Sequence, residues 1–179
     1  MRAELELAFG NCQYPHKCIC DECNSFQLVT EPILYLLDEG GSSEHPVQIV
    51  QQEQDFQLTV NNFMQKEICL TKLDKCLIAN EISKCECLLF DTSKLFFVEI
   101  KSSSTGGRGK RRKKAIEQLG NTVRLLREKN INIGAFDAKA IICFKNVEPR
   151  ITNSAANTAK VIFNQEFGIE LEERNYIDF

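Results

Sequence analysis

The hydrophobic pattern is clearest near the middle of the chain, where two apolar runs flank a short polar segment. Residues 87–90 (CLLF) and 95–98 (LFFV) stand on either side of residues 91–94 (DTSK). Strand-forming residues around a polar turn predict a β-hairpin. An apolar run upstream predicts a third strand, which completes a meander. The three strands are expected at residues 69–79, 85–91 and 94–101.

Apolar positions with helical spacing follow the meander. Ile116, Leu119, Val123 and Leu126 predict a helix over residues 113–129. Residues 138–145 (AKAIICFK) then predict a buried strand. A strand, a helix and a strand in this order predict a right-handed crossover and a parallel pair. Farther on, the pattern predicts a helix at 153–167 that stops at Gly168, and a short strand at 169–172.

The first third of the chain is less regular. Residues 26–38 are mostly apolar, and Pro32 suits the first turn of a helix, so a helix is expected here. Partial alternation predicts strands at 47–50 and 56–60, with a helix over 51–66 as the alternative. Together the elements predict one α/β domain of 179 residues, in which a central mixed β-sheet is flanked by helices.

Charge is distributed unevenly along the chain. Net charge is −3, but residues 108–114 hold six of the 22 lysines and arginines. Without those six, 16 basic residues face 25 acidic ones, a balance of −9. An acidic body with one basic segment predicts a localised anionic partner. No membrane helix or export signal is evident, so a cytoplasmic protein without a membrane partner is expected.

The end of the hairpin that lies away from its turn carries candidate chemistry. Side chains alternate between the two faces of a strand, so Glu99 and Lys101 share a face. On the other strand, Glu86 points to the face opposite to Cys85 and Cys87. If the strands pair around the turn, Glu86 lies across from the end that carries Glu99 and Lys101. Two adjacent carboxylates and an ammonium are suited to bind Mg²⁺ and to stabilise charge on a phosphoryl oxygen.

This order of elements resembles the PD-(D/E)xK nuclease superfamily, which has the restriction-endonuclease-like fold. The strongest match is VEIKSS, in which Glu99, Ile100 and Lys101 form the ExK element. KCECLLF looks like the strand that carries the first metal ligand, here Glu86, and KKAIEQLGN looks like the helix that follows, with Gln118 near the site. The resemblance covers roughly residues 69–145, the expected core.

The resemblance implies a Mg²⁺- or Mn²⁺-dependent nuclease that hydrolyses phosphodiester bonds of DNA, or less expectedly RNA, with defence against foreign nucleic acid as a role by analogy. Glu86, Glu99 and the Ile100 carbonyl would hold the metal. Lys101 would stabilise the transition state, and Gln118 would orient the site. Phosphate contacts are expected from the basic segment: Arg108, Lys110, Arg111, Arg112, Lys113 and Lys114. A homodimer or a partner protein is also consistent with a small nuclease.

One position departs from the family pattern. The first metal ligand is usually aspartate, whereas residue 86 is glutamate. Asp91 and Asp74 are therefore competing candidates for this ligand, although turn aspartates such as Asp91 commonly make local hydrogen bonds. One of four spare carboxylates could add a ligand, but nothing in the spacing selects one: Glu31, Asp38, Glu39 and Glu44.

Nine cysteines occur in the chain, and several lie within residues 1–24. Cys12, Cys18, Cys20 and Cys23, with His16, could enclose a structural Zn²⁺, although their spacing matches no common zinc module. Two alternatives to an enzyme follow from these observations. One is a binding module of the same fold without catalytic activity, and the other is a zinc-stabilised interaction protein.

Overall fold

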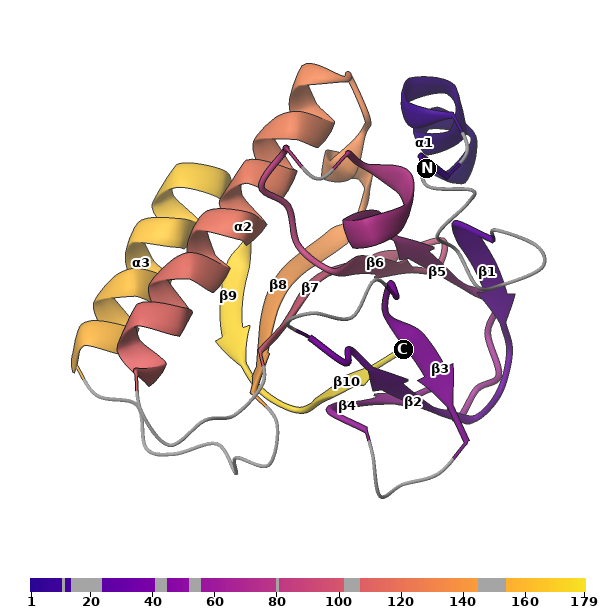
Figure 1. Ribbon diagram of the computed structural model, residues 1–179, viewed down its shortest axis with the longest axis horizontal. Helices are drawn as coiled ribbons and strands as arrows, with labels where there is room; N and C mark the ends of the chain where they lie inside the picture. The colour runs from indigo at the N-terminus through magenta and orange to yellow at the C-terminus, as the bar shows by residue number, and fades with distance from the viewer. Residues whose placement is uncertain are drawn as a thin grey trace.

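A computed structural model of the chain describes most of the expected elements. It covers residues 1–10, 12–13, 24–40, 45–51, 56–79, 81–101, 107–144 and 154–179. Within these residues, strands form two sheets, and helices lie on one side of the larger sheet (Figure 1). The chain is thus an α/β protein with a mixed sheet, as the sequence predicts.

The larger sheet contains six strands among the described residues, in the order β1-β5-β6-β7-β8-β9. Each of the strands β1, β5, β6 and β7 is antiparallel to its neighbour, whereas β7, β8 and β9 run parallel. The bounds are β1 Phe26–Val29, β5 Ile68–Lys72, β6 Cys87–Phe90, β7 Lys94–Lys101, β8 Asp137–Phe144 and β9 Glu170–Glu173. The predicted meander and the parallel crossover pair are confirmed.

The smaller sheet has the order β10-β4-β2-β3 among the described residues. Its bounds are β2 Ile33–Leu37, β3 Gln48–Val50, β4 Leu58–Asn61 and β10 Tyr176–Asp178. The helices are α1 Arg2–Phe9, α2 Arg108–Glu128 and α3 Ser154–Phe167, with a short 3-10 helix, η3, at Ile133–Ala135. Helices α2 and α3 lie side by side over the larger sheet (Figure 1).

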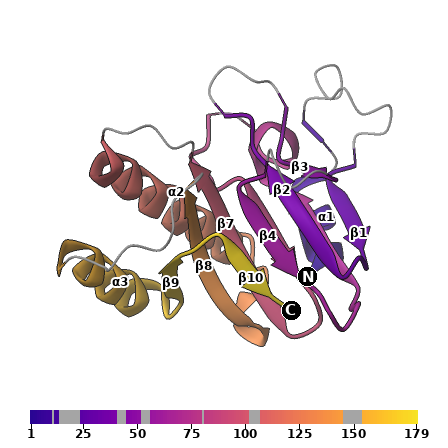
Figure 2. The same cartoon turned by 90° about the horizontal axis from the view of Figure 1, so that it is seen from below.

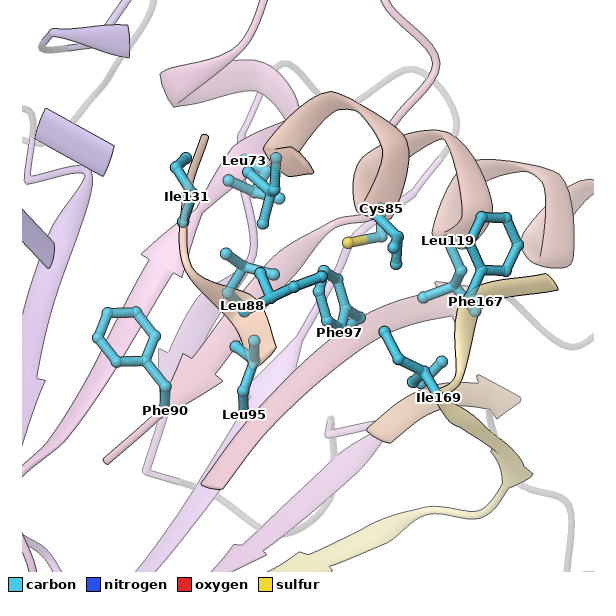
Figure 3. Close-up of a cluster of buried hydrophobic side chains, with 14 of the residues drawn as sticks. Leu73, Cys85, Leu88, Phe90, Leu95, Phe97, Leu119, Ile131, Phe167 and Ile169 are labelled. Carbon is cyan, nitrogen blue, oxygen red and sulfur yellow. The ribbon is translucent and has the colours of Figure 1, made fainter. Parts of the chain in front are cut away.

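Both faces of the larger sheet are buried, which explains why its strands read as continuous apolar runs. On the helical face, Leu88 and Phe97 pack with Leu119 of α2 and Phe167 of α3 (Figure 3). On the other face, a second cluster joins the larger sheet to the smaller one, which includes β2, β4 and β10 (Figure 2). Gly120 lets α2 and α3 approach closely, because a Cβ there would lie 2.9 Å from the Phe167 ring.

The helix expected at residues 26–38 is wrong. This segment forms β1 and β2, with Pro32 in the connection between them. Burial alternates along β2, where Leu34 and Leu36 are buried and Ile33 is 39% exposed, so a period of two prevails. The Pro32 carbonyl accepts a hydrogen bond from Asn62 (2.8 Å), which anchors the connection to the end of β4.

Other boundaries shift by a few residues. The strand expected at 69–79 ends at Lys72, and the chain then enters a kinked turn at Leu73–Leu77. Helix α2 begins at Arg108, so the basic segment forms its first turns instead of preceding it. The strands expected at 47–50 and 56–60 are confirmed as β3 and β4. Gly168, with φ 66°, ends α3 as predicted.

Candidate functional site

The pairing of β6 with β7 brings two glutamates together. Cys87 pairs with Val98, and the Glu86 amide donates to the Val98 carbonyl (3.0 Å). Continuing this register places Glu86 directly across from Glu99. Residues directly opposite each other in an antiparallel pair have Cβ atoms about 5 Å apart. The predicted juxtaposition of Glu86 with the end of β7 is therefore confirmed.

The alternation predicted at Cys85 is wrong. Cys85 is fully buried and packs with Leu88 and Phe97 on the helical face (Figure 3). The regular strand begins only at Cys87, and the Cys85 amide donates to the Thr122 hydroxyl of α2 (2.8 Å). Because residue 85 lies outside the strand, the period of two does not extend back to it.

Lys101 and Gln118 are held together at this end of the hairpin. The Lys101 ammonium forms an ion pair with Glu99 Oε1. It also donates to Gln118 Oε1 (2.7 Å), and Gln118 Nε2 donates to the Lys84 carbonyl (2.9 Å). Helix α2 thus fixes the position of Lys101 through the side-chain amide of Gln118, because its oxygen and its nitrogen each make a hydrogen bond. The proximity of Gln118 to the ExK residues agrees with the prediction.

The kinked turn contributes a third carboxylate. Both the Leu73 and the Asp74 amides donate to the Glu86 carbonyl, at 3.0 and 3.2 Å. The Asp74 carboxylate forms an ion pair with Lys84 (2.9 Å), whose side chain is 2% exposed. Asp74 therefore lies beside Glu86 in a turn, not within a strand as the sequence predicts.

A fourth carboxylate, Asp38, comes from the end of β2 in the smaller sheet. It is 6% exposed, and its backbone is fixed by two hydrogen bonds with the Gln57 side chain, at 2.6 and 2.7 Å. Its carboxylate lies 3.6 Å from the Lys75 ammonium. Sequence spacing could not select Asp38, Lys75 or Lys84, because packing between two sheets and a kinked turn brings them to the site.

Burial and nearby negative charges raise the pKa values of Glu86 and Glu99. Burial raises the pKa of Glu99 to about 7, although the adjacent Lys101 opposes this rise. The pKa of Glu86 lies well above its ordinary value because of burial and then the charge of Glu99. The charges of Asp38 and Asp74 raise the pKa of both glutamates, so the four carboxylates form one electrostatic cluster. We call these four residues the acidic cluster.

Glu99 Oε1 has only its ion pair with Lys101, and two further oxygens of the acidic cluster have no partner of either kind among the described residues: Glu86 Oε2 and Glu99 Oε2. Buried polar atoms rarely lack a partner, so these two oxygens are available to bind a ligand. The donors are all oxygen atoms, which fits a hard cation such as Mg²⁺ that keeps several of its waters. Across the described parts of the chain, however, no three His, Cys, Asp or Glu side chains are grouped closely enough to hold a metal.

Asp91, the competing candidate, lies at the turn of the hairpin and not at its open end. Its Oδ1 accepts from the backbone amides of Ser93 and Lys94, both at 2.6 Å, and Oδ2 pairs with Lys66 (3.3 Å). Burial raises the pKa of Asp91, but the hydrogen bonds from Lys94 and Ser93 outweigh it, and the pKa is lowered. Asp91 thus acts as a turn residue.

The basic segment divides between two sides of α2. Arg108 and Arg112 form ion pairs with Glu173 of β9, and Arg108 also lies over the Phe144 ring (4.7 Å). Lys110, Lys113 and Lys114 are exposed. Lys114 and Arg111 precede Gln118 by four and seven residues, so they share its helical face. The expected phosphate contacts of Arg108 and Arg112 therefore compete with an internal partner.

The predicted zinc ligands fall mostly outside the described residues. His16, Cys18, Cys20 and Cys23 are in this group, while Cys12 is described and half-buried. The Gln13 amide donates to the Cys76 carbonyl (2.8 Å), so the start of this segment is attached to the kinked turn. The zinc site stays a prediction.

No protein-family model matches the chain, and neither a curated protein nor a solved structure matches it. Among the helices in the described ranges, none is long and apolar enough to cross a bilayer. Any assignment of activity therefore depends on the geometry of the site.

Proposed function

We propose that the protein is a metal-dependent nuclease that cleaves phosphodiester bonds, with DNA as the favoured substrate. The observation that carries the proposal is the buried pair of Glu86 and Glu99, whose free oxygens lie beside a lysine that α2 holds in place. Two carboxylates kept out of water are costly unless a cation joins them. The order β5-β6-β7-α2-β8 also supports the resemblance to the restriction-endonuclease-like core.

In this proposal, Glu86 and Glu99 hold Mg²⁺ or Mn²⁺, with the Ile100 carbonyl as a further ligand. When bound, the cation supplies Lewis-acid stabilisation of negative charge on the phosphate. Lys101 places its ammonium where it stabilises the charge that develops during hydrolysis. Gln118 keeps Lys101 in this position, because its amide accepts from Lys101 and is itself anchored to the Lys84 carbonyl.

The exposed lysines of the basic segment provide the expected contact with the phosphate backbone. Lys114 lies on the same face of α2 as Gln118, so a strand held there would extend past the acidic cluster. Contacts of this kind contribute affinity that salt weakens, and they do not read sequence. Cleavage without strong sequence preference is the outcome this arrangement favours.

A binding module of the same fold is the second candidate. It is favoured by the lack, in the described ranges, of a three-residue group positioned to hold a metal. In that case Lys101 would be only the counter-ion of Glu99, and the exposed basic residues of α2 would account for nucleic-acid binding.

Cleavage of plasmid DNA, single-stranded DNA and RNA with Mg²⁺ or Mn²⁺ tests the proposal, with Lys101→Ala and a chelator as controls. The nuclease proposal predicts cleavage of DNA that disappears in the variant and with chelator. Nucleic-acid binding by a folded wild-type protein that cleaves none of the substrates would favour the binding module instead.

A further inference from the structure

Lys75 has an unusual backbone conformation beside the acidic cluster. Its φ is 57° and its ψ is 15°, the left-handed region, which is unfavourable for a residue other than glycine. Asp74, the residue before it, is extended at φ −71° and ψ 141°. This change of direction within the kinked turn brings Asp74 and Lys75 to the cluster from the same short segment. Residues held in such conformations concentrate at functional sites.

The Lys75 side chain points toward carboxylates that other elements supply. Its ammonium lies 3.6 Å from Asp38 Oδ1, and the side chain is 19% exposed. The charge of Lys75 also lowers the pKa of Glu86, against the effects of burial and of the neighbouring acids. Lys75 therefore acts electrostatically on two carboxylates, one from each sheet region.

Three of the four carboxylates in the acidic cluster form ion pairs with lysines, and the fourth forms none among the described residues. Lys101 pairs with Glu99, Lys84 with Asp74 and Lys75 with Asp38. Glu86 makes no ion pair within the described part of the chain. Of the three lysines, Lys84 is 2% exposed and Lys101 is held by Gln118, whereas Lys75 has the longest ion-pair distance and the most exposed side chain.

We propose that Lys75 is a built-in counter-ion that occupies the acidic cluster when no divalent cation is bound, and that a divalent cation displaces it from Asp38. The inference rests on the proposed function, because it assigns a regulatory group to the same site. Lys75 and the cation compete for the same negative charge, because Lys75 pairs with Asp38 and also acts on Glu86, a proposed ligand of the cation. Metal binding in this protein is accordingly weaker than its carboxylates alone would make it.

Titration with Mn²⁺, followed through the electron paramagnetic resonance signal of the free ion, tests this inference without any substrate. Lys75→Asn removes the charge and suits a left-handed residue, because asparagine tolerates that conformation. Lys75→Arg keeps the charge and serves as the matched control. We expect Lys75→Asn to bind Mn²⁺ at least about tenfold more tightly than the wild type, because the charge of Lys75 acts on Glu86, a proposed metal ligand, and opposes a second cation in the same cluster. Lys75→Arg should bind Mn²⁺ within about twofold of the wild type, since its charge is retained.

The possible results separate this inference from the nuclease proposal. A wild type that binds Mn²⁺ and cleaves DNA, beside a folded Lys75→Asn variant of unchanged affinity, would overturn the role of Lys75 alone. If neither protein binds Mn²⁺, the metal-dependent nuclease and the counter-ion role both fail. Thermal unfolding gives a second readout: without metal, Lys75→Asn should melt below Lys75→Arg, and saturating Mn²⁺ should remove the difference. An equal difference with and without Mn²⁺ would indicate a purely structural lysine.

Discussion

Acidic residues at the two ends of the β6–β7 hairpin differ in how many hydrogen-bond and ion-pair partners they have. At the turn, Asp91 accepts from two backbone amides and pairs with Lys66, so its charge is fully compensated. At the open end, Glu86 and Glu99 are buried opposite each other with free oxygens, and the pKa of each is raised by burial. The fold supplies hydrogen-bond and ion-pair partners to an acid with a structural role, whereas acids that bind a ligand keep oxygens without such partners.

The largest expected effect is on catalysis at the open end. Lys101→Ala should lower DNA cleavage at least about a hundredfold, the usual loss when one charge-stabilising group is removed from an active site. DNA affinity, measured by fluorescence anisotropy in Ca²⁺, should change little. Gln118→Ala should give a smaller loss of cleavage, because Lys101 keeps its charge and loses only its support from α2. Full activity in a folded Lys101→Ala variant would remove the lysine from the proposed site.

The next effect is a pH dependence of stability that comes from Glu99. Its pKa is about 7 in the folded protein against an ordinary value of 4.5. A raised pKa means that the folded state binds the proton more tightly, so stability is lost as pH rises from 4.5 through 7. At about 1.4 kcal/mol for each pH unit, the loss is roughly 3 kcal/mol.

Glu99→Gln should lack this part of the pH dependence, because the amide does not ionise. Urea unfolding of both proteins at pH 5 and pH 8, in the presence of a chelator, measures the difference. The variant is expected to be the more stable of the two at pH 8. Parallel pH profiles for wild type and variant would contradict the burial of an uncompensated carboxylate at this position.

At the turn end the effect should be on stability alone. Asp91→Ala removes the acceptor for the Ser93 and Lys94 amides, which should cost about 1–2 kcal/mol of unfolding free energy. Cleavage by the folded variant should match the wild type, because Asp91 lies at the other end of the hairpin. Urea unfolding and a cleavage assay on the same preparation check both parts. Loss of cleavage in a stably folded Asp91→Ala variant would reverse the assignment of the two ends.

The smallest effect concerns the basic segment. Lys114 lies on the Gln118 face of α2, whereas Lys113 borders the groove between α2 and α3. Lys114→Ala should weaken DNA binding a few-fold and reduce the salt dependence by about one phosphate contact. Lys113→Ala, which removes the same charge from the same turn, should change both quantities less. Equal effects would show that only the net charge of the segment matters.

The hairpin and its glutamates could be predicted because their determinants are local. Alternation along 94–101 sets the face of Glu99 and Lys101, and a short turn fixes the register that brings Glu86 opposite. The same locality accounts for Gln118, since the helix that follows β7 packs back on the sheet. Residues that are close together in the sequence determine these elements, so a single sequence is enough to predict where they lie.

The remaining parts of the site depend on contacts between distant segments. Asp38 comes from the end of a strand in the smaller sheet, and the pattern of its segment predicts a helix, because Pro32 suits a helix start as well as a strand connection. The short strand β10 pairs with β4 across more than 100 residues and has no long apolar run to reveal it. Glu173, the partner of Arg108 and Arg112, also lies far along the chain, 65 and 61 residues away. The hydrophobic pattern of a short stretch of sequence does not predict contacts between such distant segments.

Anomalous diffraction from crystals soaked in Mn²⁺ would test the central claim most directly, because it locates the ion without reference to activity. The comparison of the two hairpin ends predicts a peak between the Glu86 and Glu99 carboxylates, which Glu99→Gln should weaken and Asp91→Asn should leave unchanged. Crystals in which Mn²⁺ fails to occupy the open end at saturating concentration, or occupies the Asp91 turn instead, would contradict a cation site at these glutamates.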